Sequence, residues 1–444
     1  MKPPTVPTSG AALNPSARSG LAPTRALLDN GAAVVVKATR KTPAVAMNVA
    51  VRAGSVCDPA DASGAMHLLS RVIDRGTATR SADVIAEELD SRGISLTINV
   101  TRHLFSVVCT CLAQDFEAVL SLVAEVLTAP SVPDVELATR KGEVITAIRQ
   151  DDDNPAIRAI EGLMAMLYGP VHPYGRRAKG TIEAVESLTR DRLLALHAAR
   201  FAPSELSAVI VGDVDPSKAI EAAAKVFGGW RAPAPAPIGL PAVVPPTRRR
   251  RQILPMMNKA QTDIAYGFTT IGRLHPAYYA FWLMNHALGQ YALGGRLGDS
   301  IRERQGMAYY VSSIFDANVS DGPLMIRAGV GPSNVDRAVA SIDHELTRLR
   351  AEGLTLKELN ESRQYLIGAM PRALETNAGI AAFLQTAEFF GLGLDYDEVL
   401  PALLGAVTLE DANAAARSTL DPDRASLVIA GPYDDAARND GPRP

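Results

Sequence analysis

The chain has 444 residues, of which 47% are hydrophobic and 21% are charged, and this usage is typical of a folded globular protein. The 45 Lys and Arg residues nearly balance the 48 Asp and Glu residues, which leaves a formal net charge of −3. Such a chain provides no long-range field for nucleic acid or for an anionic membrane, and it is long enough for two or more domains with sizeable cores.

Two features of the sequence bear on the compartment. No stretch approaches the roughly 18 consecutive apolar residues of a membrane span, and the N-terminal region lacks the apolar segment of a secretion signal. The only cysteines, Cys57, Cys109 and Cys111, are too few for a disulfide framework. We therefore expect a cytoplasmic protein, with the periplasm or the mitochondrial matrix as alternatives.

The N-terminal residues 1–24 are rich in Pro, Ser, Ala and Thr and contain no Asp or Glu. This composition predicts a disordered tail, and a weak transit peptide is the alternative. A β-rich run follows at 45–53, and alternation at 94–100 predicts another strand. Cys109 and Cys111 are two residues apart and are expected on one face of a strand.

The predicted helix after Gly64 carries a candidate metal-binding residue. A helical His followed at i+4 by a second donor places two ligands on one face. His67 is followed at that spacing by Arg71, which has no lone pair to donate, and Ser70 stands where a general base would be needed. The turn is therefore not a two-ligand zinc site. We interpret His67 as a hydrogen-bonded helix residue rather than as the partner of Ser70 in a hydrolytic pair.

A Pro-rich segment at 232–246 divides the chain into near halves. Its composition predicts a semi-rigid, extended linker, to which we assign residues 232–250. The four consecutive arginines at 248–251 have no aromatic residues among them. We expect them to be solvated or docked on acidic surface rather than to bind nucleic acid.

The second half repeats the pattern of the first. Each half closes with a predicted helix, a turn and a β-rich run, which end at the equivalent positions Gly212 and Gly431. We predict an α+β protein of two duplicated, homologous domains, each an antiparallel-rich sheet packed with helices. Their predicted bounds are 25–231 and 251–432, followed by a tail at 433–444. The repeat also rests on the strand-like run 263–271 and on the helical runs 135–150 and 356–369.

The phrase around His67 resembles the zinc peptidases of the insulinase and mitochondrial processing peptidase group. Their inverted motif H-x-x-E-H lies in a G-x-x-H-x-x-E-H run that is followed shortly by G-T, and this chain keeps Gly64, His67, Gly76 and Thr77. The resemblance extends from about residue 22 to Gly431, over both halves and the linker. It implies the fold of that family.

The same resemblance implies that the metal motif is degenerate here. Ser70 stands at the position of the family's Glu, and Arg71 at that of the second His. The third ligand of the family is a Glu just before an acidic D-x-P run, and counting back from the run at 151–155 places Ala147 there. Glu143, one helical turn earlier, would have only His67 as a companion donor. We expect no metal and no catalytic residue in this chain.

The segment 294–313 carries the second recognisable element. Family members have an Arg and a Tyr seven residues apart here, which hold the substrate peptide near the zinc, and Arg302 and Tyr309 have that spacing. An Arg fork and a Tyr hydroxyl can both donate to a peptide carbonyl. The alternative is a surface ion pair for Arg302 and a core role for Tyr309. Strand alternation sends the neighbouring Tyr310 to the opposite face.

These observations favour a non-catalytic, substrate-binding subunit of a heteromeric zinc peptidase. The resemblance implies a homologous, zinc-binding catalytic partner in a heterodimer or heterotetramer, with peptides or unfolded polypeptides as substrates. The alternative is a purely structural subunit, like the core proteins of the respiratory bc1 complex. An active hydrolase that uses another site has no supporting constellation. The remaining histidines have no partner at metal-ligand spacing: His103, His172, His197, His275, His286 and His344.

Overall fold

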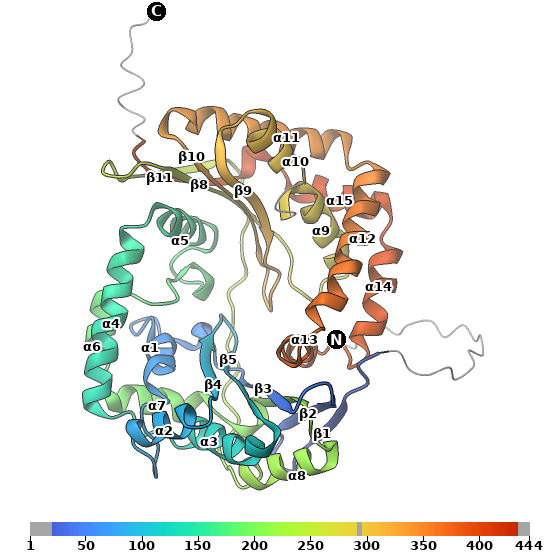
Figure 1. Cartoon of the computed structure of the whole chain (residues 1–444). Coiled ribbons are helices and arrows are strands. Elements are labelled where there is room, and N and C mark those ends of the chain that lie inside the picture. Colours follow the sequence, from blue (N-terminus) through green and yellow to red (C-terminus); the bar gives the residue numbers. More distant parts are fainter. Residues whose placement is uncertain (1–19, 291–294, 434–444) are drawn as a thin grey trace, which may run out of the picture.

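Two mixed β-sheets, one in each half of the chain, form the frame of the protein. The structure is a computed structural model, and it describes residues 20–290 and 295–433. The first half contains a six-stranded sheet with the order β1-β2-β6-β3-β5-β4, and the second a five-stranded sheet with the order β7-β11-β8-β10-β9. In Figure 1 the first sheet lies in the lower part of the molecule and the second in the upper part.

The elements of each half follow one another as strands, helices, and a closing strand. The first half consists of β1 (Thr24–Leu27), β2 (Ala33–Ala38), β3 (Ala44–Val51), α1 (Ala65–Val72), α2 (Ala82–Asp90), β4 (Ser95–Val100), β5 (Phe105–Leu112), α3 (Phe116–Thr128), α4 (Asp134–Asp152), α5 (Pro155–Tyr168), α6 (Ile182–Ser187), α7 (Arg190–Arg200), β6 (Leu206–Gly212) and α8 (Pro216–Phe227). The second half consists of β7 (Arg250–Pro255), β8 (Thr262–Thr269), α9 (Tyr278–Asn285), η5 (His286–Gln290), α10 (Gly295–Leu297), η6 (Gly298–Arg304), β9 (Ala308–Phe315), β10 (Pro323–Val330), α11 (Val335–Glu352), α12 (Leu356–Ala373), α13 (Asn377–Phe390), α14 (Tyr396–Ala406), α15 (Leu409–Thr419) and β11 (Ser426–Gly431).

The two sheets share one connectivity, which confirms the predicted duplication. In the first half the closing strand β6 pairs parallel with β2 and antiparallel with β3, and in the second half β11 pairs in the same way with β7 and β8. Gly212 and Gly431 end these two strands with φ of 151° and 141°, which explains why both positions are glycine. The fold class is the predicted α+β pair of helix-packed sheets.

The central strands of each sheet are buried on both faces, and the second face is covered by a helix from the other half. Alternate residues of β6 contact different clusters: Ala208 and Ile210 belong to the core of the first half, whereas Val209 and Val211 pack against α13. This double burial explains why β6 and β11 are continuous apolar runs without polar alternation.

The covering helices are exchanged between the halves. Helix α5 belongs to the first half but packs on β8 and β11 of the second, and α13 belongs to the second half but packs on β3 and β6 of the first. Figure 1 shows α5 beneath the upper sheet and α13 above the lower one. The approach of α5 is close, because a Cβ at Gly162 would lie 3.1 Å from Val428 and a Cβ at Gly267 3.0 Å from Leu163.

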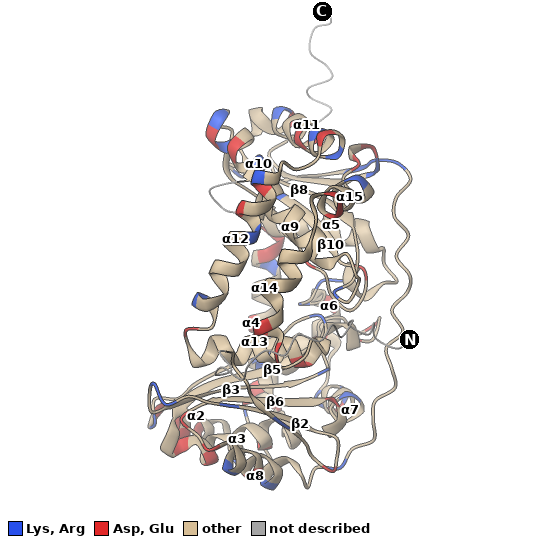
Figure 2. Cartoon of the chain, turned by 90° about the vertical axis from the view of Figure 1, so that its right-hand side faces the viewer, with Lys and Arg blue, Asp and Glu red and all other residues tan. Residues whose placement is uncertain are grey.

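The Pro-rich linker and the arginine run lie against the folded halves. No helix or strand forms in the described residues between Phe227 and Arg250. Arg249 pairs with Asp343 at 2.7 Å and Arg251 donates to the Tyr433 hydroxyl at 2.8 Å, so these arginines dock on the protein surface. Figure 2 shows basic and acidic residue positions interspersed along the ribbon of both halves, which agrees with the small net charge.

Structured residues lie just outside both ends of the predicted domains. The backbone N–H of Leu21 donates to Asp397, and β1 begins at Thr24, so the last residues of the expected N-terminal tail belong to the fold. Tyr433 is buried at the other end. Cys109 and Cys111 are both free and buried on one face of β5, as predicted. Within the described ranges, no helix is long and apolar enough to cross a membrane.

The exchanged helices predict that the two halves unfold together. The chain has two tryptophans, Trp230 near the first core and Trp282 in the second, so the single replacements Trp230→Phe and Trp282→Phe each leave a reporter for one half. Leu384→Ala removes a fully buried side chain of α13 and should cost about 2–5 kcal/mol of unfolding free energy.

In urea unfolding followed by tryptophan fluorescence, Leu384→Ala should lower the unfolding midpoints of both reporters by the same amount. The matched control is Leu356→Ala, which truncates a leucine that is 60% exposed and should change stability by about 0.5 kcal/mol or less. A shift confined to one reporter would show that the halves unfold independently.

Candidate functional site

The candidate site of the first half is built on α1 and α4, which pack against each other. Helix α1 begins after Gly64, whose φ of 86° places it in the left-handed region, and a side chain there would clash with the backbone of Lys179. The buried Asp58 carboxylate accepts hydrogen bonds from the backbone nitrogens of Gly64 and Met66, both at 2.8 Å. These contacts fix the start of α1 and bring Lys179 close to it.

His67 lies half-buried on α1 in a cationic environment. Burial, together with the nearby charges of Lys179 and Arg71, lowers the pKa of His67 to about 4, while Asp151 opposes the shift. The imidazole is therefore neutral at pH 7. The Ser70 hydroxyl donates to the backbone oxygen of His67 at 2.6 Å and is engaged with the helix rather than with the imidazole. This geometry gives no hydrolytic pair of Ser70 and His67.

Arg71 extends from α1 toward the acidic face of α4. Its Nη2 atom lies 3.9 Å from Oε2 of Glu143, which also pairs with Arg140 of its own helix. Glu143 is thus held by two guanidinium groups, and Ala147, one turn further along α4, offers no donor. The positions that resemble the family's metal motif therefore bring together an imidazole, a hydroxyl, a guanidinium and a methyl group.

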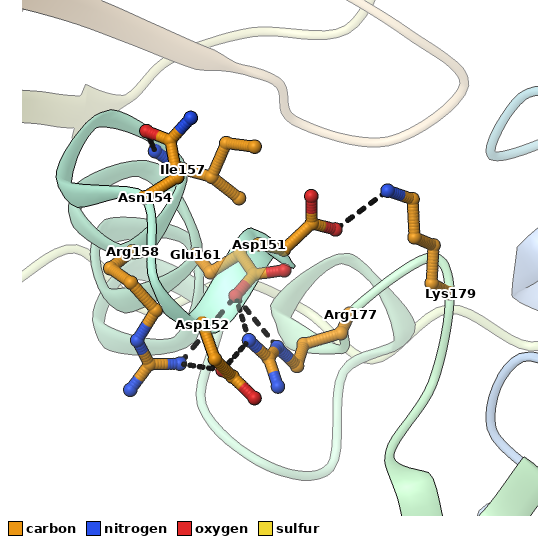
Figure 3. Close-up of polar contacts among 8 residues, drawn as sticks. All are labelled: Asp151, Asp152, Asn154, Ile157, Arg158, Glu161, Arg177 and Lys179. Carbon is orange, nitrogen blue, oxygen red and sulfur yellow. Dashed lines mark hydrogen bonds and ion pairs between the residues drawn. The ribbon is translucent and has the colours of Figure 1, made fainter. Parts of the chain in front are cut away.

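A second ion pair lies beside His67, at the C-terminal end of α4. Nζ of Lys179 lies 2.7 Å from Oδ2 of Asp151, which is buried at the end of α4 (Figure 3). Beside it, Arg177 binds both Asp152 and Glu161, so the segment that carries Lys179 is tied to α4 and α5. Sequence reasoning missed Lys179, because its approach to α1 depends on the tertiary packing at Gly64.

The donor set of this site does not fit zinc. A zinc ion needs three or four neutral or anionic donors, and here two cationic side chains lie beside the single imidazole and hold the adjacent carboxylates. Within residues 20–290 and 295–433, no group of three or more His, Cys, Asp and Glu side chains is placed to hold a metal ion. We therefore derive no catalytic step through a metal in this chain.

The second half contributes Arg302 and Tyr309 from η6 and the edge strand β9. The Tyr309 side chain is 77% exposed, whereas the Tyr310 hydroxyl donates to Asp263 and the Tyr310 ring lies under Arg327. Strand alternation therefore separates the two tyrosines as expected. Nε and Nη2 of Arg302 lie 2.8 Å and 2.7 Å from Oε1 of Glu303, whose side chain is 56% exposed.

A pocket of about 660 Å³ lies where the two halves and the linker meet, and no local sequence pattern predicts it. Its walls are largely apolar, and the Arg52 guanidinium reaches into this region from the end of β3, where it donates to the backbone oxygen of Phe389 at 3.0 Å. Its other lining residues include Val56, His103, Ile238, Leu274 and Val319. They come from segments far apart in the chain.

The lowered pKa values of the buried histidines predict a loss of stability in mild acid. Burial lowers the pKa of His67, His103 and His286 to about 4 in each case, whereas an unfolded histidine titrates near 6.5. Between these values each of the three imidazoles binds more protons in the unfolded chain than in the folded chain, whereas Asp58, whose pKa burial raises to about 7, acts in the opposite direction. The contribution of these three histidines to the free energy of unfolding should be complete above about pH 6.5 and should be lost as the pH decreases toward 4.

Urea unfolding at pH 7.0, 6.0 and 5.0 measures the free energy of unfolding as a function of pH. His67→Gln should remove the contribution of this histidine to the pH dependence. Histidine NMR titration provides a direct check. A His67 imidazole that titrates at or above 6.5 in the folded protein would contradict the predicted direction.

Comparisons with known proteins agree with this architecture. The family model "Insulinase (Peptidase family M16)" matches residues 33–172, and the model "Peptidase M16 inactive domain" matches residues 187–366. Proteins named uncharacterized zinc proteases are similar over nearly the whole chain. That of Mycobacterium leprae is 28% identical over 92% of both chains, and that of Bacillus subtilis is 26% identical over 90% of this chain and 96% of its own.

Solved structures show the same fold. The crystal structure of a peptidase M16 inactive domain from Pseudomonas fluorescens has a TM-score of 0.86 and 26% identity, and the match covers 93% of this chain and 98% of that one. A protease from Helicobacter pylori has a TM-score of 0.84 at 17% identity, with 92% and 99% covered, which shows likeness of fold alone. The family models and the full-length relatives together show that this chain belongs to the M16, or insulinase, family of peptidases.

Proposed function

We propose that this chain is the non-catalytic, substrate-binding subunit of a heteromeric zinc metallopeptidase. The observation that carries the proposal is the cationic replacement of the metal motif: Arg71 and Lys179 hold the carboxylates beside His67, while Ser70 and Ala147 provide no base and no ligand. The relatives are named zinc proteases, so the metal and the base would come from a homologous partner with an intact H-x-x-E-H motif.

The second half supports a role in substrate binding. Tyr309 lies exposed on β9, which forms the edge of its sheet, so its hydroxyl is accessible to a peptide. Arg302 is paired with the exposed Glu303, and an exposed ion pair contributes only about 0–1 kcal/mol. A substrate carbonyl with better geometry can therefore compete with Glu303 for the guanidinium. We propose the cytoplasm as the compartment, in keeping with three free, buried cysteines.

A purely structural subunit is the second candidate function. The observation that favours it is the same pairing of Arg302 with Glu303, which satisfies the guanidinium within the chain. The two functions differ in what the loss of the Tyr309 hydroxyl should do. A structural subunit tolerates that loss, whereas a substrate-binding subunit does not.

Reconstitution with the catalytic partner tests the proposal as a whole. The purified chain alone should contain far less than one zinc per molecule by elemental analysis and should not cleave unfolded peptides. Co-expression with a homologous chain that carries an intact H-x-x-E-H motif should give a stable complex with chelator-sensitive peptidase activity. Stoichiometric zinc in the isolated chain, or chelator-sensitive proteolysis by it, would overturn the non-catalytic assignment.

The Tyr309 hydroxyl and the Arg302 fork should matter to turnover in that complex. Tyr309→Phe keeps the exposed ring and removes one donor, and loss of one oxyanion donor typically lowers turnover by roughly 100- to 1000-fold. Arg302→Lys keeps the charge but loses the planar fork and should also impair cleavage. The measurements are kcat and KM for a peptide substrate, together with the melting temperature of the complex.

Tyr310→Phe is the matched control, because it removes the hydroxyl of the neighbouring tyrosine, which is engaged with Asp263 on the other face of β9. It should lower stability and leave kcat unchanged. If Tyr309→Phe and Arg302→Lys both cleave at the wild-type rate, the structural subunit becomes the better description.

A further inference from the structure

The first turn of α14 holds a buried carboxylate that is only half satisfied. Asp397 is 7% exposed, and its Oδ2 accepts a hydrogen bond of 2.6 Å from the backbone nitrogen of Leu21. Its Oδ1 is buried without a hydrogen-bond partner. A buried carboxylate oxygen that accepts no hydrogen bond lowers the stability of the folded protein, so a donor for this atom would be stabilising.

A second carboxylate lies next to the same point of the chain. The side chain of Glu398 packs so closely on Gly20 that any Cβ there would overlap it. Neither Asp397 nor Glu398 forms an ion pair with a cation of the described residues. The helix dipole of α14 favours negative charge in its first turn and accounts for the exposed Glu398, but it supplies no donor to the buried Oδ1 of Asp397.

The residues after Gly20 hold the Leu21 nitrogen in place. The Leu21 side chain packs into the cluster that α13 forms with the first sheet. Ala22 has a φ of 43°, an unfavourable conformation for a residue with a Cβ, which is maintained only where surrounding contacts impose it. Further along, Arg25 forms a bidentate pair with Glu388 of α13 at 2.9 Å and 3.0 Å.

We propose that Asp397 and Glu398 form a binding site for the α-ammonium group of Leu21, created by hydrolysis of the Gly20–Leu21 peptide bond. An endopeptidase would add water across this bond: the hydroxyl goes to the Gly20 carbonyl carbon, and the Leu21 nitrogen leaves as an amine and binds a proton. The same nitrogen atom that now offers one N–H would then offer three. It can donate to both oxygens of Asp397 and, where Gly20 has left, to Glu398.

The ammonium also corrects the charge balance of this region. The charged groups near this point are Asp395, Asp397 and Glu398 on α14, Glu388 on α13, Arg25 on β1 and the buried Arg273, which donates to the Tyr396 hydroxyl. The Arg25 charge is already neutralised by Glu388, so negative charge remains in excess. One positive charge placed between Asp397 and Glu398 is therefore favourable. Removal of residues 1–19 together with Gly20 would thus strengthen the attachment of the N-terminal segment to the second half. This inference is independent of the proposed peptidase role.

The test compares the full-length chain with a chain that begins at Leu21 with a free amine, released from a cleavable fusion. The shorter chain should melt about 2 °C or more above the full-length chain at pH 7. The difference should disappear when the pH rises well above 8, because an α-amino group loses its proton there and both chains share all other titrating groups of the fold. Equal melting temperatures at pH 7, or a difference that persists at pH 10, would overturn the proposal.

Two further measurements keep the test decisive. Asp397→Asn should abolish the difference between the two chains, whereas Glu388→Gln, which disturbs a carboxylate of α13 already paired with Arg25, should leave it unchanged. If Asp397→Asn does not fold, the reactivity of the Leu21 amine toward an acylating reagent replaces it, and folding should slow that reaction at least 10-fold relative to urea-unfolded chain. The mass of the protein from its own cells should correspond to a start at Leu21, and a start at Met1 would contradict the cleavage.

Discussion

The exchange of α5 and α13 between the halves is the contact on which the rest of the structure depends. Each sheet has one face covered by its own helices and the other by a helix of the opposite half. Without that partner helix, the outward-facing residues of β6, β8 and β11 would expose continuous apolar surface to water. The packing of these helices, rather than the linker, therefore sets the relative position of the two halves. It also fixes the surface around His67 relative to the surface around Arg302 and Tyr309.

Within that frame, helices α1 and α4 carry the positions that resemble the family's metal motif. The two helices pack together, and the close contact of Gly64 with the Lys179 backbone fixes where α1 begins. Their charged side chains balance one another as ion pairs. Arg71 and Lys179 supply positive charge next to Glu143 and Asp151, so the acidic face is neutralised within the chain and a divalent cation would meet repulsion.

In the second half, two adjacent tyrosines of β9 differ in their exposure to solvent. Tyr310 is engaged in its own sheet through Asp263, while Tyr309, one residue away, is exposed at the sheet edge. This division of two adjacent tyrosines is the simplest consequence of strand alternation. It separates a side chain that stabilises the domain from one that is accessible to a ligand, and it gives the proposed substrate contact a matched internal control.

The sequence by itself determined the duplication, the strands that end at Gly212 and Gly431 and the Pro-rich segment between the halves, and it predicted a degenerate metal motif at His67. These features are local, because they depend on periodicity, spacing and the chemistry of single side chains. Only the tertiary structure decided which helix covers which sheet, that Lys179 lies beside His67, and that Asp397 holds the Leu21 nitrogen. Those contacts join residues that are far apart in the chain, in the last case by 376 positions, and no local pattern encodes them.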